Sequence, residues 1–288
     1  MSHGPGIDKI LNVLEERGII ASNNLHVRHL KGTTDGLVYI LSNGEKPQYV
    51  LKLDHAEQIK LAEQFLTAYS GSELLSRVFY VDPDKAYMVY AYIEGMTHYN
   101  RGLKINWMTR LVEDLLNHYK QERQSETWGR LELPRQSWRE FNEGSLEYAR
   151  ETVADLLPCE DHYKIKRLVE NKLKDEGPEA KYLLHGDTGV HNFVYAQNKL
   201  VGVIDPSPML GPVLYDFTYA FCSSPDDLNL ETLHAAYALL THEQVESSRL
   251  IEETVFQLYC RIGICTKHHP HDLEEYLKVW SYWKTLIE

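Results

Sequence analysis

The spacing of hydrophobic residues in the first third of the chain predicts a small sheet flanked by helices. Residues 7–17 repeat apolar positions with the 3.6-residue period of a helix, and Gly18 is well placed to end it. The period then changes to the two-residue alternation of strands, with turn-rich segments between the runs. We expect strands over residues 25–30, 37–41 and 48–54, a helix over 55–69, and a pair of strands within 79–92.

A shift in composition at Gly95 marks the start of a mostly helical part. Helical spacing predicts helices at residues 106–121, 137–157 and 161–174, and again toward the C-terminus. One short apolar hairpin, within residues 193–204, interrupts these helices. The chain is therefore expected to form two lobes, residues 1–94 and 95–288, with a hinge near 91–95 and a ligand cleft between them.

The stretch from His185 to Asp216 concentrates the polar residues that phosphoryl transfer needs. It reads HGDTGVHN, then the hairpin, then VIDPSPMLGPVLYD. Two antiparallel strands of similar length bring Asn192 and Asp205 to one end of the hairpin, where an amide oxygen and a carboxylate can share Mg²⁺. Asp187 lies outside this pair and is placed to accept a hydroxyl proton. Any one of these residues alone would suit a turn, but three at this spacing predict a catalytic site.

This block resembles the aminoglycoside phosphotransferase and choline kinase family, whose members share a protein-kinase-like fold. The family pattern is HGDxxxxN, a hydrophobic strand that ends in Asp, and a more distant Asp, and every position is filled here. The resemblance implies that Asp187 is the catalytic base and that Asn192 and Asp205 bind the metal. It implies that Asp216 braces the catalytic loop through backbone N–H groups and that His185 is architectural. The expected fold is α+β, with a small antiparallel-sheet lobe followed by a larger helical lobe.

The residue before Asp187 distinguishes this chain from regulated protein kinases. Many of those carry Arg there, where this chain has Gly186, so a phosphorylated activation loop would lack its partner. The segment from Asp205 to Asp216 is also too short for such a loop. Both features favour a small-molecule kinase over a protein kinase.

The front third supplies candidates for binding the nucleotide phosphates. Lys52 lies in the strand YVLKLD, and in the family a Lys on this strand binds phosphates and is oriented by a helix Glu. Glu63 is expected to be that partner, because it shares a face with apolar residues of the helix over 55–69. Glu57 is the alternative, although it lies nearer the polar side.

Two further segments match the order of nucleotide-binding parts in the family. Gly32, Thr33 and Thr34 lie in the turn between the first two strands, where hydroxyl and backbone N–H groups would reach phosphate oxygens. The segment YMVYAYIEG resembles the hinge strand, so main-chain groups of Ala91 and Ile93 would bind the base of ATP or GTP. No GxxxxGK[ST] sequence occurs, which excludes a P-loop enzyme.

Charge and hydropathy restrict the partners of the chain. A net charge of −12 argues against general nucleic-acid binding, which requires a basic surface, and gives a weak indication of an amine-bearing acceptor. No apolar run approaches the roughly 18 residues of a membrane span. The N-terminal sequence MSHGPGIDK has no features of a signal peptide. We therefore expect a cytoplasmic protein that acts on a small molecule and binds neither nucleic acid nor membrane.

The four cysteines show no CxxC pairing and are expected to be small buried residues in a reducing compartment. One cluster has the residue types of a zinc site, and it consists of Cys265, His268, His269 and His271. Pro270 and Asp272 instead suit a loop and a helix N-cap, and no complementary pair of ligands follows. A structural loop is therefore the favoured interpretation.

These features predict transfer of the γ-phosphoryl group of ATP or GTP to a hydroxyl of a small acceptor, with Mg²⁺ as cofactor. Acceptors of the family include aminoglycosides, choline and sugars. The alternatives are a protein kinase, a hydrolase in which Asp187 and the metal activate water, and an inactive nucleotide-binding regulatory module. The intact set of Lys52, Asp187, Asn192 and Asp205 argues against the regulatory module, because a decayed site usually loses one of them.

Overall fold

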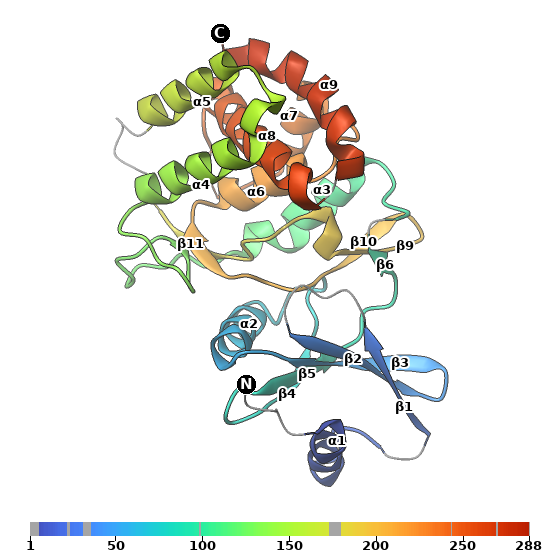
Figure 1. Cartoon of the computed structure of the whole chain (residues 1–288). Coiled ribbons are helices and arrows are strands. Elements are labelled where there is room, and N and C mark those ends of the chain that lie inside the picture. Colours follow the sequence, from blue (N-terminus) through green and yellow to red (C-terminus); the bar gives the residue numbers. More distant parts are fainter. Residues whose placement is uncertain are drawn as a thin grey trace.

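The computed structural model describes residues 6–21, 24–30, 36–97, 99–172, 180–242, 244–268 and 270–287. Figure 1 shows a smaller lobe built around a sheet and a larger lobe built mostly of helices. The expected α+β arrangement of an N-terminal antiparallel sheet followed by helices is therefore confirmed. The exact boundary between the lobes, at residues 94 and 95, stays a prediction.

A five-stranded antiparallel sheet forms the smaller lobe, with its strands in the order β1-β2-β3-β5-β4. The strands are β1 (Leu25–Leu30), β2 (Leu37–Asn43), β3 (Lys46–Leu53), β4 (Val78–Val81) and β5 (Tyr87–Ala91). Helix α1 (Ile7–Glu16) covers one face, where Ile10 and Leu14 pack with Leu51 and Val89. This face forms a small hydrophobic core of its own.

Helix α2 (Ala56–Ala68) packs on the other face of this sheet. Met88 of β5 belongs to the same buried cluster as Ile59 and Ala62 of this helix. Lys52 is directly opposite Met88 in the register of β3 and β5, so both side chains point to the α2 face. The strand pairing thus directs the expected phosphate-binding lysine toward the larger lobe.

Gly95 marks the point where the chain enters the larger lobe. A Cβ atom on this residue would lie 2.6 Å from both Tyr195 O and Val194 Cγ1. The close approach lets the next strand, β6 (Met96–Thr97), pair with β9 (Phe193–Ala196). Together with β10 (Lys199–Val203) they form a sheet in the order β10-β9-β6, which joins the crossing to the expected hairpin.

A third sheet, with the order β7-β11-β8, was not expected from the sequence. Its strands are β7 (Gly129–Arg130), β8 (Tyr182–Leu184) and β11 (Met209–Gly211). Strands of two or three residues are too short to show a two-residue alternation, so the sequence pattern does not predict them. The sheet matters because β8 leads directly into His185.

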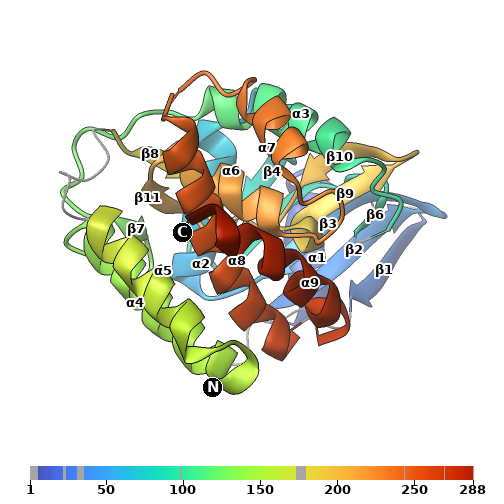
Figure 2. The ribbon, with the colours of Figure 1, turned by 90° about the horizontal axis from the view of Figure 1, so that it is seen from above.

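Seven α-helices lie in the described part of the larger lobe: α3 (Lys104–Asp114), α4 (Trp138–Val153), α5 (Cys159–Lys172), α6 (Val213–Cys222), α7 (Leu230–Tyr237), α8 (Ser247–His268) and α9 (Leu273–Trp283). Short 3₁₀ turns are η1 (Leu116–His118), η2 (Ala154–Leu156), η3 (Val190–Asn192), η4 (Pro270–Asp272) and η5 (Lys284–Ile287). Figure 2 shows α4 and α5 along one edge of the lobe, while α8 packs against α4 and α6. No described helix is long and apolar enough to cross a membrane.

The cysteines are only partly buried, in contrast to the expectation. Cys222 and Cys265 lie in the core, whereas Cys159 is exposed. Within the described residues no three His, Cys, Asp or Glu side chains gather as a metal site would require. His269 of the suggested zinc cluster lies outside these residues.

A buried lysine caps the C-terminal end of α6. Lys104 is 1% exposed, and its Nζ donates to the carbonyl oxygens of Phe221 at 2.8 Å and Ser224 at 2.7 Å. The same nitrogen lies 4.8 Å from the centre of the Phe221 ring. Burial lowers the pKa of Lys104 to about 7. The contact anchors α6 to the start of α3.

Replacing Gly95 with Ala should destabilise the fold by about 1–3 kcal/mol, because the added Cβ would overlap the main chain of β9. Urea unfolding of both proteins measures the difference. The matched control is Gly144→Ala, in α4, where a Cβ meets nothing within 4 Å. That change should stabilise the fold by roughly 0.5–1 kcal/mol. Equal midpoints for Gly95→Ala and the wild type would contradict the close approach.

The lowered pKa of Lys104 makes the free energy of unfolding depend on pH. The unfolded chain keeps its proton up to the ordinary pKa of 10.5, whereas the folded protein releases it near 7. The contribution of Lys104 to the free energy of unfolding should therefore rise as pH increases from 7 to 10.5.

Urea unfolding at several pH values compares the wild type with Lys104→Met. The difference between their free energies of unfolding should grow with pH across this window. Lys60→Met, which removes a lysine at an exposed position of α2, is the matched control. A flat difference for Lys104→Met would show that the buried amine stays charged.

Candidate active site

A tight hairpin holds the two expected metal ligands at one end of β9 and β10. Gln197 and Asn198 form its turn with φ angles of 50° and 61°, the conformation that suits the twist of antiparallel strands. At the opposite end, Ile204 N donates to Asn192 O at 2.9 Å. Asn192 therefore lies beside the residue that precedes Asp205, which agrees with the arrangement expected from the strand lengths.

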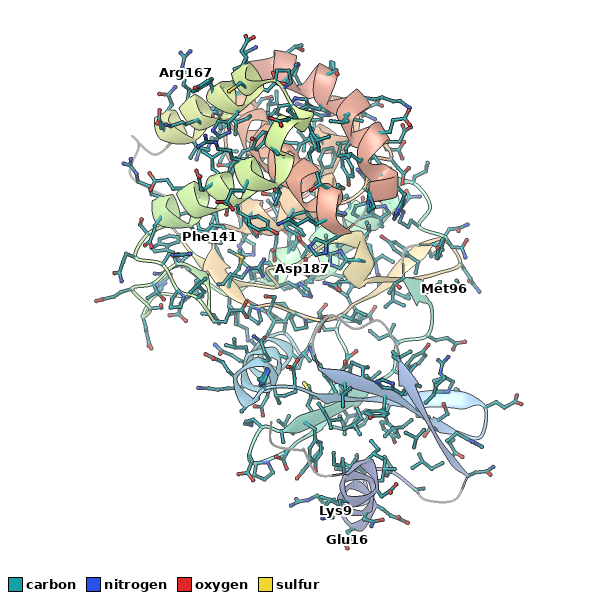
Figure 3. All side chains as sticks on the ribbon, in the orientation of Figure 1. Lys9, Glu16, Met96, Phe141, Arg167 and Asp187 are labelled. Atoms are coloured by element: carbon teal, nitrogen blue, oxygen red, sulfur yellow. The ribbon has the colours of Figure 1, made fainter. Side chains whose placement is uncertain are left out.

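Asp187 lies in the loop between β8 and the hairpin, in the part of the helical lobe nearest the sheet (Figure 3). Its Oδ2 accepts from Asn192 Nδ2 at 2.9 Å and lies 3.1 Å from His191 Nε2. Its Oδ1 is buried and has no hydrogen-bond partner of good geometry among the described residues, although the Tyr219 hydroxyl lies near enough to lower the pKa of Asp187. Burial raises the pKa of Asp187, but His191 and the Arg130 guanidinium outweigh burial and hold that pKa below its usual range. The Asp187 carboxylate is therefore ionised, and its Oδ1 is available to accept a hydrogen bond.

Lys52 connects the two lobes through Asp205. Its Nζ lies 2.6 Å from Asp205 Oδ1 and 3.5 Å from Asp54 Oδ2. Burial lowers the pKa of Lys52, but the two carboxylates outweigh burial, so the pKa is raised. The charged ammonium group therefore lies between the sheet and the expected metal ligand.

The predicted pairing of Lys52 with Glu63 is wrong. The Glu63 carboxylate instead lies 2.6 Å from the Nζ of Lys85, in the turn between β4 and β5. Glu63 is at the margin of the buried face of α2 and 32% exposed, so its side chain turns to the sheet edge. Asp54, two residues from Lys52 on the same strand face, supplies the carboxylate, while the alternative Glu57 is exposed.

His185 is fully buried and connects the loop that carries Asp187 (residues 185–192, the catalytic loop) to the end of β10. Its Nδ1 accepts from the Asp187 N–H at 3.3 Å, so its Nε2 carries the proton and donates to Ile204 O at 3.1 Å. This arrangement needs a neutral ring, and burial lowers the pKa of His185 to about 4. The ring also meets Phe65 of α2 edge-on, with 5.3 Å between centres. These contacts are those of an architectural residue.

Asp216, on the buried helix α6, binds the start of the catalytic loop. Its carboxylate accepts from the Gly186 N–H at 3.1 and 3.2 Å and from the Tyr119 hydroxyl at 2.7 Å. The Tyr119 oxygen in turn accepts from the His185 N–H at 3.2 Å, and Thr188 Oγ1 donates to Asp216 O at 2.7 Å. Burial raises the pKa of Asp216 to about 6, against the effect of these hydrogen bonds. Asp216 thus fixes the residues on both sides of Asp187: its side chain holds Gly186, and its main-chain carbonyl holds Thr188.

Gly186 has a structural reason to be glycine. Its φ is 78°, and a Cβ would collide with the carbonyl oxygen of Ser207. The Ser207 N–H donates to His185 O at 3.0 Å, which holds the two segments together. An arginine could not occupy this position without moving the loop.

A small pocket lies between the lobes beside Lys52. Its lining comes from the sheet, α2 and the end of β10, and includes Lys52, Leu66, Met88, Tyr90, Val203 and Asp205. The Tyr90 side chain forms part of its wall. Charged groups at one side and apolar side chains at the other suit a nucleotide.

The expected hinge contacts are available in part. The Ala91 N–H already donates to Arg77 O at 2.8 Å, so that N–H is not available to a base in this structure. No hydrogen bond in the described structure engages the main chain of Ile93. The expected phosphate-binding residues Gly32, Thr33 and Thr34 lie outside the described residues.

Four residues of the site were not expected from the sequence. Asp54 and His191 had local signals, because Asp54 shares a strand face with Lys52 and His191 lies next to Asn192. Tyr119 and Arg130 had none, since both come from a segment more than 50 residues before the catalytic loop. Only the folded chain brings them to Asp187.

A model of the phosphotransferase enzyme family (APH) matches residues 26–247. The match covers well over half of the chain and contains every residue of the site. The chain belongs to this family. Membership makes it an ATP-dependent phosphotransferase that acts on hydroxyl groups.

Solved structures of kinases share the fold of this phosphotransferase over nearly its whole length. Choline kinase from Cryptosporidium parvum Iowa II is 10% identical with a TM-score of 0.61, covering 97% of this chain and 94% of that one. A thermostable mutant of APH(4)-Ia, bound to ADP and hygromycin B, is 14% identical with a TM-score of 0.61 and 98% coverage of both chains. A choline/ethanolamine kinase family protein from Mesorhizobium loti is 16% identical with a TM-score of 0.57, covering 98% and 94%. No curated protein matches the sequence.

Replacing Tyr119 with Phe should loosen the catalytic loop while keeping the aromatic packing. The change leaves the buried His185 N–H without its acceptor and removes a donor to Asp216, which should cost about 1–3 kcal/mol of unfolding free energy. Urea unfolding measures the loss. The control Tyr99→Phe, at a side chain 68% exposed, should change stability by less than about 0.5 kcal/mol. Equal stability of the two variants would contradict a stabilising role for the Tyr119 hydroxyl.

Proposed function

We propose that this phosphotransferase transfers the γ-phosphoryl group of ATP or GTP to a hydroxyl of a small-molecule acceptor. The state of Asp187 supports the proposal: the carboxylate is held ionised, and its buried Oδ1 has no hydrogen-bond partner of good geometry in the described chain. Such an oxygen can accept a hydrogen bond from the acceptor hydroxyl and then take its proton. Asn192 and His191 fix the other oxygen, so the base is oriented before the acceptor binds.

The nucleotide is proposed to bind in the pocket beside Lys52. The ammonium group would offset phosphate charge, and the Ala91 carbonyl with the main chain of Ile93 would hydrogen-bond the base. Gly32, Thr33 and Thr34 remain proposed contacts to the phosphates. Glu63 is no longer proposed to orient Lys52, because Asp54 holds that position.

Asn192 and Asp205 are proposed to hold Mg²⁺, and their surroundings fit that role. Asn192 uses its Nδ2 to donate to Asp187, which leaves the amide oxygen for a cation. The Asp205 side chain is 59% exposed, and its one ion pair within the described residues is with Lys52. Two oxygen donors with room for water form the kind of set that Mg²⁺ binds. When bound, the ion offsets negative charge on the phosphates.

The segment between Asp205 and Asp216 argues against a protein substrate. Residues Met209–Gly211 form β11, which pairs with β7 on one side and β8 on the other. Helix α6 then begins at Val213. This segment is occupied by regular structure, whereas regulated protein kinases place a long activation loop there.

Asp187→Ala tests the proposal. Wild-type protein with Mg²⁺ and ATP should release ADP only when an acceptor is present, in a coupled assay across amino sugars, macrolides, choline, sugars and hydroxy acids. Loss of the base should lower kcat by about 10²–10⁴-fold. The dissociation constant of ATP, measured by titration calorimetry, should change by less than about threefold, because Asp187 is not expected to bind the nucleotide.

The matched control is Asp155→Ala, which removes an exposed carboxylate and should leave both quantities unchanged. Near wild-type turnover by Asp187→Ala would contradict the assignment of the base. Phosphate release without any acceptor would favour a hydrolase. Nucleotide binding with no turnover on any acceptor would favour a regulatory module.

A further inference from the structure

A guanidinium group lies beside the catalytic loop although the loop itself contains no arginine. Arg130 of β7 is paired with Met209 of β11, and Met209 is paired with Leu184 of β8. Because β8 leads directly into the loop, this register places Arg130 two strands away from the residue before His185. Its charge is close enough to lower the pKa of Asp187.

Ser207 fixes one end of this guanidinium. Arg130 Nη1 donates to Ser207 Oγ at 2.7 Å and to Ser207 O at 3.2 Å. The same carbonyl oxygen lies against Gly186, the residue before the base. Arg130 is therefore held within the site by the segment that follows Asp205.

The N–H donors on the other edge of the Arg130 guanidinium, Nε and Nη2, are available to a ligand. In the described chain no hydrogen bond engages Arg130 Nε or Nη2, and the residue as a whole is half-buried. The nearby Glu132 carboxylate accepts from Gln58 Nε2 at 3.0 Å instead. Nε and Nη2 together form the planar two-donor edge that matches the two oxygens of a carboxylate.

Neutral aromatic side chains adjoin Arg130. Tyr215 and Tyr219 lie one turn apart on α6, with 5.9 Å between ring centres, and burial raises the pKa of both hydroxyls. Trp138 and Phe141 of α4 stack at 4.7 Å, and both meet Tyr215 edge-on. Figure 3 shows Phe141 at the start of α4, in the same part of the lobe as β11. These rings bring no negative charge to compete with Asp187.

We infer that the acceptor is a hydroxy acid, and that Arg130 binds its carboxylate through Nε and Nη2 while its hydroxyl faces Asp187. The inference rests on the proposed function and refines it. The net charge of −12 favours cationic ligands over the whole surface. The affinity for an acceptor, however, depends mainly on the charged groups close to Asp187, and Arg130 is one of them. Arg130 offsets the repulsion that Asp187 would exert on an anionic acceptor.

Three matched pairs of acceptors test the inference: glycerate and glycerol, pantothenate and pantothenol, and 4-(hydroxymethyl)benzoate and its amide. The coupled ADP assay gives kcat and KM for each compound, and calorimetry with ADP and Mg²⁺ present gives its dissociation constant. In the wild type, the carboxylate member of at least one pair should be favoured by about tenfold or more in kcat/KM or in affinity.

Arg130→Met should remove this preference, mainly by raising KM about 10–100-fold more for the carboxylate than for its neutral partner. Any effect of the change on the base Asp187 is shared by both members of a pair, so the ratio of their kcat/KM values is the readout. Arg130→Lys should restore only part of the preference, because an ammonium cannot form the two-donor edge. The control Arg139→Met removes an exposed arginine of α4 that pairs with Glu143 and should change neither member. Circular dichroism and the Tm establish that each variant is folded.

Two outcomes would overturn the inference. One is a neutral member that is turned over and bound at least as well as its carboxylate partner in every pair. The other is an equal fall in kcat/KM for both members of each pair in Arg130→Met. Turnover of glycerol, choline or amino sugars without any carboxylate preference would leave the proposed function standing. Absence of ADP formation with every acceptor would contradict the proposed function, and the affinities would then decide the inference alone.

Discussion

Burial of the Asp216 carboxylate is the constraint on which the catalytic loop depends. A carboxylate with no exposure to water is costly unless it is hydrogen-bonded, and its partners here are the Gly186 N–H and the Tyr119 hydroxyl. Satisfying that one group fixes the backbone immediately before Asp187. Lys104 holds the other end of α6 to α3, so the helix that carries Asp216 is itself anchored.

The two lobes meet through contacts that surround the same loop. Phe65 of α2 packs on His185, and the Tyr69 hydroxyl donates to Leu183 O at 2.6 Å, so α2 is attached to the strand that leads into the loop. Lys52 adds a charged contact to Asp205. Under the proposed function, a nucleotide and its metal ion would enter between these last two residues, so the groups that hold the lobes together are also those that would bind phosphate.

The sequence predicted the parts of this site that are local and failed where the parts come from a distance. Asp187, Asn192 and Asp205 lie within 19 residues, and the strand alternation around them sets which residues share an end of the hairpin. The same alternation predicted the strand that carries Lys52, and the family resemblance pointed to Lys52 itself. The carboxylate partner of Lys52 could not be predicted in this way. A side chain at the margin of a helical face can point inward or toward the sheet edge, and the Glu63 side chain points to Lys85. Tyr119 and Arg130 reach the loop through tertiary packing and through strands too short to leave a periodic signal.

The contacts of Asp216 position Asp187, the proposed base, and the kcat of Asp216→Asn measures what that positioning contributes. Asparagine keeps the size of the side chain but replaces an acceptor with an N–H group that faces other donors. In this variant kcat for phosphoryl transfer should fall by about 10²-fold, while the dissociation constant of ATP stays within about threefold and the protein remains folded. Unchanged kcat in a folded variant would show that Asp216 does not position Asp187 for the reaction.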